Sequence, residues 1–228
     1  MNRLSSKQIL LKWRRHLALK MGVTKYCQVG NWRLIDELFK GQPPGVFIEA
    51  GAHDGWTGSN SYWLEAELGW QGILVEPVPG LYEACRKERP KAKVFHGALV
   101  SMDYSSPEIQ IECSGLVSAV KTSPLEKETF EIAKAYYGIS ERPTVSVPAL
   151  TLNSCLEKSG FDKVDFVSLD VEGFEPQALA GLDLAKWKPA YMLIECNDET
   201  AVRRQLGERY EIEQRCPPCD ILFKRTNS

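Results

Sequence analysis

The stretch FIEAGAHDGWTG, residues 47–58, joins an apolar run to a glycine turn through the acidic residue Glu49. The apolar run is typical of a buried β-strand, and the glycines at 51 and 55 let the chain turn tightly behind it. A strand that only filled a core would have no use for a carboxylate at its end, because burying an unpaired charge costs free energy. The stretch therefore predicts a strand followed by a ligand-binding turn.

The same alternation of apolar segments and helix-like segments continues through the chain. Strands are predicted at 45–50, 72–77, 93–100, 164–171 and 190–196, with a closing pair at 210–215 and 220–225. Helices are predicted at 60–68, 80–88, 176–187 and 199–210. Nearly unbroken apolar strands alternating with helices indicate an α/β fold with a mostly parallel sheet and helices on both faces. The last two strands are close enough in sequence to be antiparallel.

Composition limits the classes of function. The chain has 228 residues, enough for one α/β domain with a full core, and no Ser/Gly linker divides it. Its formal charge of −2 gives no reason to expect a nucleic acid and fits a small-molecule partner. No apolar run approaches the roughly 20 residues of a membrane span, so no transmembrane segment is expected. A homo-oligomer is left open.

Three further features bear on the cellular compartment in which the protein is expected. Residues 1–22 carry basic residues and apolar residues at helical spacing, which predicts an amphipathic helix packed over the domain rather than a signal peptide. Such a helix also suits a membrane surface. Seven cysteines, an odd number, favour a reducing cytoplasm. The CPPC motif, Cys216 to Cys219, lacks the second pair that a zinc site needs and is interpreted as two reduced thiols beside a turn.

Acidic residues stand at the predicted carboxyl ends of four strands. They are Glu49, Glu76, Asp170 with Glu172, and Glu195. In an open α/β sheet, ligands bind beyond the carboxyl ends of the strands, near the switch in strand order. Each acid alone also suits a helix cap or a solvated loop, but clustered carboxylates repel one another, so a purely structural protein would gain nothing from them. Together they favour a ligand site.

The turn after the first strand indicates the kind of ligand. A dinucleotide fold needs G-x-G-x-x-G, so that pyrophosphate can sit at the helix N-terminus. Here the spacing is G-x-x-x-G, from Gly51 to Gly55, with Glu49 before it and Asp54 inside it. Two acids would repel a pyrophosphate but attract a sulfonium and an amino group, and Glu76 is placed to bind both hydroxyls of a ribose. The pattern therefore predicts S-adenosylmethionine as the cofactor.

Several stretches also resemble the FkbM-type methyltransferases. They run from about residue 45 to about residue 196 and include VFHGALVS (94–101), YMLIEC (191–196) and, as the most specific block, LDVEGFE (169–175). The resemblance implies a Rossmann-like class I methyltransferase fold with a seven-stranded sheet, and O-methylation of a small acceptor such as a sugar or a secondary metabolite. The family more often has Asp in place of Glu49 and Asn in place of His53, and the longer Glu49 can still reach the cofactor.

The resemblance also implies roles for individual residues. The methionine end of the cofactor would be held by Glu49, Gly51, Ala52, His53 and Gly55, the ribose by Glu76, and the adenine would be bordered by Ala98 and its neighbours. Ser59, Asn60, Pro77 and Asp170 complete the predicted cofactor site. The predicted catalytic residues, facing the transferred methyl and the acceptor, are Asp170, Glu172 and Glu195.

Methyl transfer to oxygen requires an acceptor held in line with the methyl group and a base for the acceptor's proton. Asp170 is the first candidate for this base. Glu172 is the second, although it also suits a cap or an ion pair. His53 is a weaker candidate because it lies in the cofactor turn, where a contact to the methionine carboxylate or a packed ring is the commoner role. His96, inside an apolar strand, is interpreted as a core histidine.

Residues 101–150 break the alternation and are predicted to wall the acceptor pocket, with Tyr136 and Tyr137 as candidates for acceptor contact. The aromatic residues Trp56, Tyr62 and Trp63 suit either a stacking wall or burial against the sheet. The single predicted domain, 1–228, is thus divided into the N-terminal helix (1–22), a cofactor-binding half (45–100), the insertion (101–150) and a catalytic half (151–228).

Three alternatives remain beside the predicted methyltransferase. Asp170, Glu195 and Asn197 would suit a Mg²⁺ site that lowers the pKa of the acceptor hydroxyl, but no metal is expected. A nicotinamide-dependent oxidoreductase is the second alternative, disfavoured by the G-x-x-x-G turn. A non-catalytic cofactor-binding module is the third, disfavoured by the intact set of strand-end acids.

Overall fold

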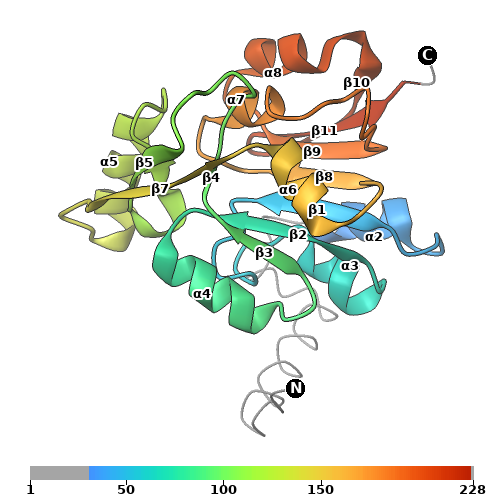
Figure 1. Ribbon diagram of the computed structural model, residues 1–228, viewed down its shortest axis with the longest axis horizontal. Helices are drawn as coiled ribbons and strands as arrows, with labels where there is room; N and C mark the ends of the chain where they lie inside the picture. The colour runs from blue at the N-terminus through green and yellow to red at the C-terminus, as the bar shows by residue number, and fades with distance from the viewer. Residues whose placement is uncertain (1–30, 227–228) are drawn as a thin grey trace, which may run out of the picture.

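The computed structural model describes residues 31–226, and its centre is a seven-stranded sheet (Figure 1). The strands lie in the order β10-β11-β9-β8-β1-β2-β3. Their bounds are β1 Val46–Ala50, β2 Gln71–Glu76, β3 Lys93–His96, β8 Phe166–Leu169, β9 Tyr191–Glu195, β10 Tyr210–Cys216 and β11 Asp220–Arg225. All neighbouring strands from β9 to β3 pair in parallel, whereas β11 runs antiparallel to both β9 and β10. The predicted mostly parallel sheet with an antiparallel closing strand is confirmed.

The strand order reverses at β1. The chain places β1, β2 and β3 side by side in one direction and then returns to add β8 and β9 on the other side of β1. Connections that diverge in this way leave a crevice beyond the carboxyl ends of the central strands. The residues that follow β1 and β8 therefore face a common space.

Helices cover both faces of the sheet, as predicted. Their bounds are α2 Asn31–Phe39, α3 Tyr62–Glu67, α4 Pro79–Glu88, α6 Leu152–Ser159, α7 Glu175–Leu179 and α8 Glu199–Leu206, with the 3₁₀ turn η2 at Gly207–Arg209. Successive side chains of a strand point to opposite faces. Phe47 accordingly packs among residues of α2, α3 and α4, and Ile48 among residues of α6, α7 and α8. Both side chains are completely buried.

The single strand predicted at 93–100 is divided in two. β3 ends at His96, and β4 Ala98–Leu99 turns away after Gly97 into a second sheet. A Cβ atom at Gly97 would lie 2.5 Å from the carbonyl oxygen of Pro148, so the close approach of these two segments requires glycine. The apolar run continues through this break, from the partly buried β3 into the buried β4, and periodicity alone does not detect the change of sheet.

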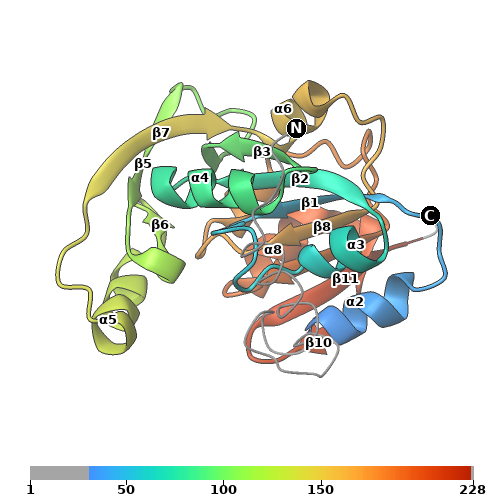
Figure 2. The same ribbon diagram turned by 90° about the horizontal axis from the view of Figure 1, so that it is seen from below.

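The insertion forms a second, smaller sheet with its own helix, and its core includes Phe174 from the segment after β8. Its sheet has the order β4-β7-β5-β6, and its elements are β5 Glu108–Glu112, the 3₁₀ turn η1 Gly115–Val117, β6 Ala119–Val120, α5 Glu126–Tyr137 and β7 Thr144–Leu150. Figure 2 shows β5, β6, β7 and α5 gathered at one side of the main sheet. The insertion therefore stands beside the carboxyl ends of the strands as a wall.

The helix predicted at 176–187 is much shorter in the structure, where α7 ends at Leu179. A Cβ atom at Gly181 would lie 2.3 Å from the carbonyl oxygen of Val100, so the chain is drawn against the start of the insertion instead of continuing the helix. The carboxylate of Asp183 then accepts hydrogen bonds from the backbone N–H groups of Ala185 and Lys186, which fixes a turn. Three helices, α2, α5 and α6, were not predicted.

The remaining predictions concern the ends of the chain. Cys216 and Cys219 are free thiols at the turn between β10 and β11, as expected. The predicted amphipathic helix at 1–22 lies outside the described residues. Within 31–226, none of the helices combines the length and the apolar character that crossing a membrane requires.

Candidate active site

A cavity of about 470 Å³ opens at the carboxyl ends of the strands, between the main sheet and the insertion. Four acidic residues line it: Glu76 at the end of β2, Asp170 and Glu172 after β8, and Glu195 at the end of β9. The structure therefore brings together four of the five strand-end acids that the sequence singled out. Among the described residues that line the cavity there is no lysine or arginine.

The turn after β1 is held close to both neighbouring strands. Gly51 has a φ of +78°, and a Cβ atom there would lie only 1.9 Å from the carbonyl oxygen of Asp170. The N–H groups of Gly51 and Ala52 both donate to the carbonyl oxygen of Val75 at 3.2 Å. Only glycine fits at position 51. Backbone atoms rather than a side chain therefore line the cavity where the chain leaves β1 and β8.

Glu76 is 4% exposed, and its carboxylate is already organised by the backbone. Its Oε2 accepts a hydrogen bond from the N–H of His53 at 2.8 Å, and its Oε1 accepts one from the N–H of Val78 at 2.9 Å. Burial raises the pKa of Glu76 to about 7. Each carboxylate oxygen has two lone pairs, so both oxygens can still accept a hydrogen bond from a ligand hydroxyl. Pro77, Ala98 and His53 lie beside Glu76 in the lining.

Glu49 has a different environment from the one that the sequence suggested. It is 3% exposed and is not among the residues that line the cavity. Its Oε2 accepts hydrogen bonds from the hydroxyls of Ser59 and Ser61 at 2.7 and 2.6 Å, and its Oε1 accepts one from the N–H of Asn60 at 2.6 Å. Glu49 thus holds the loop that follows the glycine turn. Of the other predicted cofactor residues, Ala52, Gly55, Ser59 and Asn60 also lie outside the lining.

A carboxyl cluster lies where β8 and β9 end. One oxygen from each of Asp170, Glu175 and Glu195 lies within 4.8 Å of the others. Glu175 was missed by the sequence analysis, and the only signal for it was its place at the end of the LDVEGFE block. Its Oε1 accepts hydrogen bonds from the N–H groups of Val171 at 2.9 Å and Gly173 at 3.2 Å, so it shapes the loop after β8. Asn197, the third ligand suggested for a metal, follows shortly after the end of β9 at Glu195.

The pKa values of these carboxyl groups are raised. Burial, reinforced by the negative charges of Asp170 and Glu195, raises the pKa of Glu172 to about 9. Burial also raises the pKa of Glu175 to about 7. Burial and the nearby charge of Glu175 raise the pKa of Glu195, whose Oε1 accepts a hydrogen bond from the Cys219 thiol at 3.4 Å. Raised pKa values on several groups in one cleft are typical of active sites.

The insertion supplies the apolar wall opposite the acids. Ile111, Val120 and Ile132 line the cavity from this side, together with Tyr137. Tyr137 is 50% exposed, whereas the adjacent Tyr136 is 80% exposed and does not line the cavity. The predicted position of the insertion as a wall agrees with this geometry, but only one of the two tyrosines faces the cavity.

The other aromatic and histidine side chains lie elsewhere. Trp56 and Trp63 are buried in a separate cluster with Tyr62, outside the cavity lining, which agrees with the burial interpretation. The Nε2 atom of His96 hydrogen bonds to the carbonyl oxygen of Pro77 at 3.0 Å, and its ring stacks on Tyr82. His96 is therefore a satisfied, partly buried histidine.

Comparisons with known proteins point to one family. A family model described as the methyltransferase FkbM domain matches residues 49–214. Methyltransferase FkbM from Methylobacillus flagellatus KT is 13% identical with a TM-score of 0.50, and the match covers 82% of this chain but only 45% of that chain. An O-methyltransferase from Bacillus cereus, solved in complex with SAH, is 11% identical with a TM-score of 0.50, covering 93% of this chain and 90% of that one. No curated protein matches the chain. At these identities the solved structures show the fold alone.

Proposed function

Because the chain belongs to the FkbM methyltransferase family, we propose that it transfers the methyl group of S-adenosylmethionine to a hydroxyl group of a small acceptor such as a sugar or a secondary metabolite. The observation that carries this proposal is the cavity in which the acids at the ends of β2, β8 and β9 face an apolar wall from the insertion. The class I methyltransferase fold places the cofactor at this edge of the sheet.

Two parts of the cavity suit two parts of the cofactor. The carboxylate of Glu76 is held by two backbone N–H groups and keeps free lone pairs, which suits the two hydroxyls of a ribose. The bare backbone at Gly51 lies between Glu76 and Asp170, and the surrounding carboxylates suit a sulfonium and an amino group. The absence of lysine and arginine from the described lining disfavours a phosphorylated acceptor such as a nucleic acid.

When bound, S-adenosylmethionine supplies a methyl carbon that its sulfonium activates, so the chain needs only to position the acceptor and accept its proton. Asp170 and Glu195 lie close together, with one oxygen of each within 4.8 Å of the other. We propose Asp170 as the base, because it lines the cavity and lies directly against Gly51, where the chain leaves β1 and β8. Glu172, with its pKa near 9, is protonated at neutral pH and would donate a hydrogen bond to the acceptor.

A metal-assisted form of this reaction can be tested at the cluster of Asp170, Glu175 and Glu195. The oxygens of Asp170, Glu175 and Glu195 are close enough together to bind a divalent cation. We expect turnover to be unchanged after exhaustive chelation, because burial raises the pKa values of Glu175 and Glu195, and a metal ligand must be a deprotonated carboxylate. Activity that is lost on chelation and restored by added Mg²⁺ would instead establish the metal-assisted mechanism.

The first experiment is calorimetric titration of S-adenosylmethionine into the wild type and into Glu76→Ala. We expect the variant to bind roughly 10- to 100-fold more weakly, because hydrogen bonds to a charged group contribute about 1.5–3 kcal/mol. Glu83→Ala, on the exposed side of α4, is the matched control and should bind as the wild type does. Mass spectrometry of acceptor mixtures then identifies the methylated product.

Two results would overturn the proposal. A wild type that does not bind S-adenosylmethionine would remove it, and a nicotinamide-dependent reaction would then be followed by absorbance. Binding without turnover on any class of hydroxylated acceptor would favour a non-catalytic module.

A further inference from the structure

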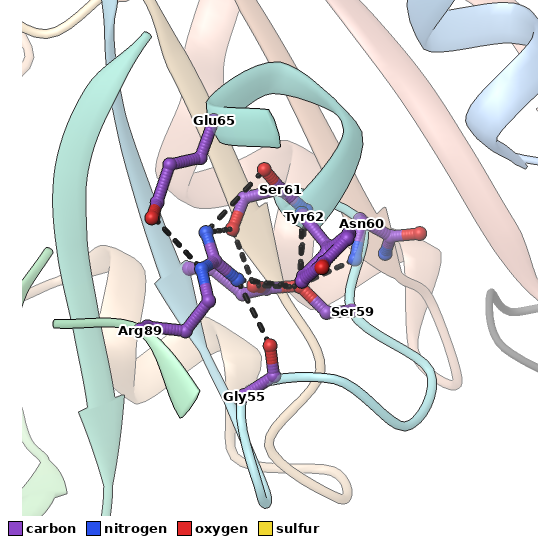
Figure 3. A network of polar contacts seen from close by, with 8 residues as sticks. Gly55, Ser59, Asn60, Ser61, Tyr62, Glu65 and Arg89 are labelled. Atoms are coloured by element: carbon purple, nitrogen blue, oxygen red, sulfur yellow. Dashed lines mark hydrogen bonds and ion pairs between the residues drawn. The ribbon is translucent and has the colours of Figure 1, made fainter. Parts of the chain in front are cut away.

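Arg89, which follows α4, is 1% exposed and is the largest side chain in the fully buried core. Its Nε donates to the carboxylate of Glu65 at 2.8 Å. Its Nη1 donates to the carbonyl oxygen of Gly55 at 3.0 Å and to the hydroxyl of Ser59 at 3.1 Å. Its Nη2 donates to the carbonyl oxygen and the hydroxyl of Ser61, at 3.4 and 3.1 Å. All five N–H donors of the guanidinium therefore have acceptors, and four of them lie in one loop (Figure 3).

The two serine hydroxyls have a fixed direction. A guanidinium can only donate, so each hydroxyl oxygen accepts from Arg89. Each hydroxyl then donates its own proton to Oε2 of Glu49, at 2.7 Å from Ser59 and 2.6 Å from Ser61. Arg89 and Glu49 thus form an ion pair bridged by two serines. The backbone N–H of Asn60 donates to the other oxygen of Glu49 and ties the main chain into the same bridge.

The opposite side of this loop faces the cavity. Thr57 and Gly58, between the two anchored ends of the loop, both line it. The loop is also fixed from within, because Asp54 accepts hydrogen bonds from the N–H groups of Trp56 and Thr57 and from the Thr57 hydroxyl. The conformation of the cavity wall at Thr57 and Gly58 therefore depends on anchoring residues that lie outside the cavity lining.

We propose that Arg89 is a positioning residue for cofactor binding: with Glu49 it clamps the loop from Gly55 to Ser61, and the clamp holds Thr57 and Gly58 in the shape that receives the cofactor. This inference rests on the proposed use of S-adenosylmethionine and gives Glu49 an indirect role in place of direct contact. Removing two charges from water is costly, and a well-packed apolar pair often stabilises a fold as well or better. A buried arginine whose donors reach four loop atoms contributes the specific conformation that an apolar residue would not impose.

The test compares Arg89→Lys with Arg86→Lys, a matched change in α4 at an exposed arginine that pairs with Glu83 and lies over the ring of Tyr82. Lysine keeps the charge but has one compact ammonium, which cannot reach Gly55, Ser59 and Ser61 together. In the protein without cofactor, we expect amide hydrogen exchange in residues 55–61 to be accelerated at least roughly tenfold, while exchange in the central strands is unchanged. The dissociation constant and the KM for S-adenosylmethionine should rise by at least roughly tenfold, with kcat and the acceptor KM retained.

Two further variants keep the inference falsifiable if Arg89→Lys does not fold. Ser61→Ala removes one bridge from the loop and should accelerate exchange and weaken binding in the same way. Glu65→Gln leaves every loop contact of Arg89 in place, so it should lower stability without weakening cofactor binding. A folded Arg89→Lys or Ser61→Ala protein with wild-type exchange and wild-type affinity would overturn the inference. Failure of the wild type to bind the cofactor would instead overturn the proposed function, and the exchange result would still stand.

Discussion

Glu49 and Glu76 end neighbouring strands, and their carboxylates meet different partners. Glu49 accepts hydrogen bonds from three consecutive loop residues, whereas Glu76 accepts two from the backbone and borders the cavity. Hydroxyl and N–H donors from Ser59, Asn60 and Ser61, which lie outside the cavity lining, satisfy the buried charge of Glu49. Two acids with the same place in their strands thus have different surroundings, and we propose a structural role for Glu49 and a binding role for Glu76.

We predict that the affinity for S-adenosylmethionine rises as the pH increases through about 7. Below that pH, Glu76 is protonated because burial raises its pKa to about 7, and a protonated carboxyl accepts two ribose hydroxyls poorly. Titration calorimetry between pH 6 and pH 8 measures this dependence. Glu76→Gln should weaken binding and flatten the curve, leaving the smaller contribution of Glu175, whose pKa is also about 7. A wild-type affinity that does not change with pH would contradict the assignment.

Replacing the proposed base gives a second prediction. Asp170→Asn should lower kcat by roughly 10²- to 10⁴-fold, the usual contribution of general-base catalysis. Single-turnover kinetics with excess enzyme isolate the chemical step. Glu172→Gln is the comparison, because an amide can still donate the hydrogen bond proposed for the protonated Glu172, so its kcat should fall far less. Equal losses in both variants would show that the base is not Asp170 alone.

At the scale of single residues, the sequence was informative wherever the backbone dictates position. Acids at the ends of parallel strands must lie at one edge of the sheet. The sequence therefore predicted that Glu76, Asp170, Glu172 and Glu195 lie near one another. Neither the direction of the Glu49 side chain nor the presence of Arg89 in the same network was predicted. Both depend on the path of a loop, and Arg89 is distant in sequence from the residues that it anchors.

At the scale of secondary-structure elements, helix α5 gives a direct test of the insertion's role. Tyr137 at its end lines the cavity, while Tyr136 next to it points to solvent. Tyr137→Ala should raise the acceptor KM several-fold, by about 1 kcal/mol of lost contact, and leave cofactor binding unchanged. Tyr136→Ala is the matched control and should behave as the wild type. Equal effects of the two substitutions, or a change in cofactor affinity, would show that α5 does not form the acceptor wall.

The apolar strands at the centre of the sheet were predicted well, and elements shaped by close approach were not. The strands at the centre of the sheet and helix α4 agree with the prediction to within a few residues. The break at Gly97 and the early end of α7 both arise where two distant segments come too close for a side chain. Such contacts are a property of the tertiary fold, and no window of local sequence contains both partners.

At the scale of the whole molecule, the raised carboxyl pKa values couple stability to pH. Glu76, Glu172 and Glu175 bind protons more tightly when folded than at their ordinary pKa of 4.5 in the unfolded chain. The folded state therefore holds more protons, and the free energy of unfolding should fall as the pH rises from about 4.5 through 7 towards 9. Urea unfolding at pH 6 and at pH 8 measures the fall. Glu172→Gln should lessen it above pH 7, and equal stability of the wild type at both pH values would contradict the shifts.

The two ends of the insertion lie side by side. β4 and β7 pair in parallel, with Ala98 opposite Ala149 and Leu99 opposite Leu150, so the chain departs and returns at adjacent positions. Because its two ends meet, we expect that the insertion can change in length and sequence without separating the strands of the main sheet. We further predict that grafting residues 101–148 onto a relative, together with the residues that pack against them, changes the acceptor and leaves the main sheet unchanged.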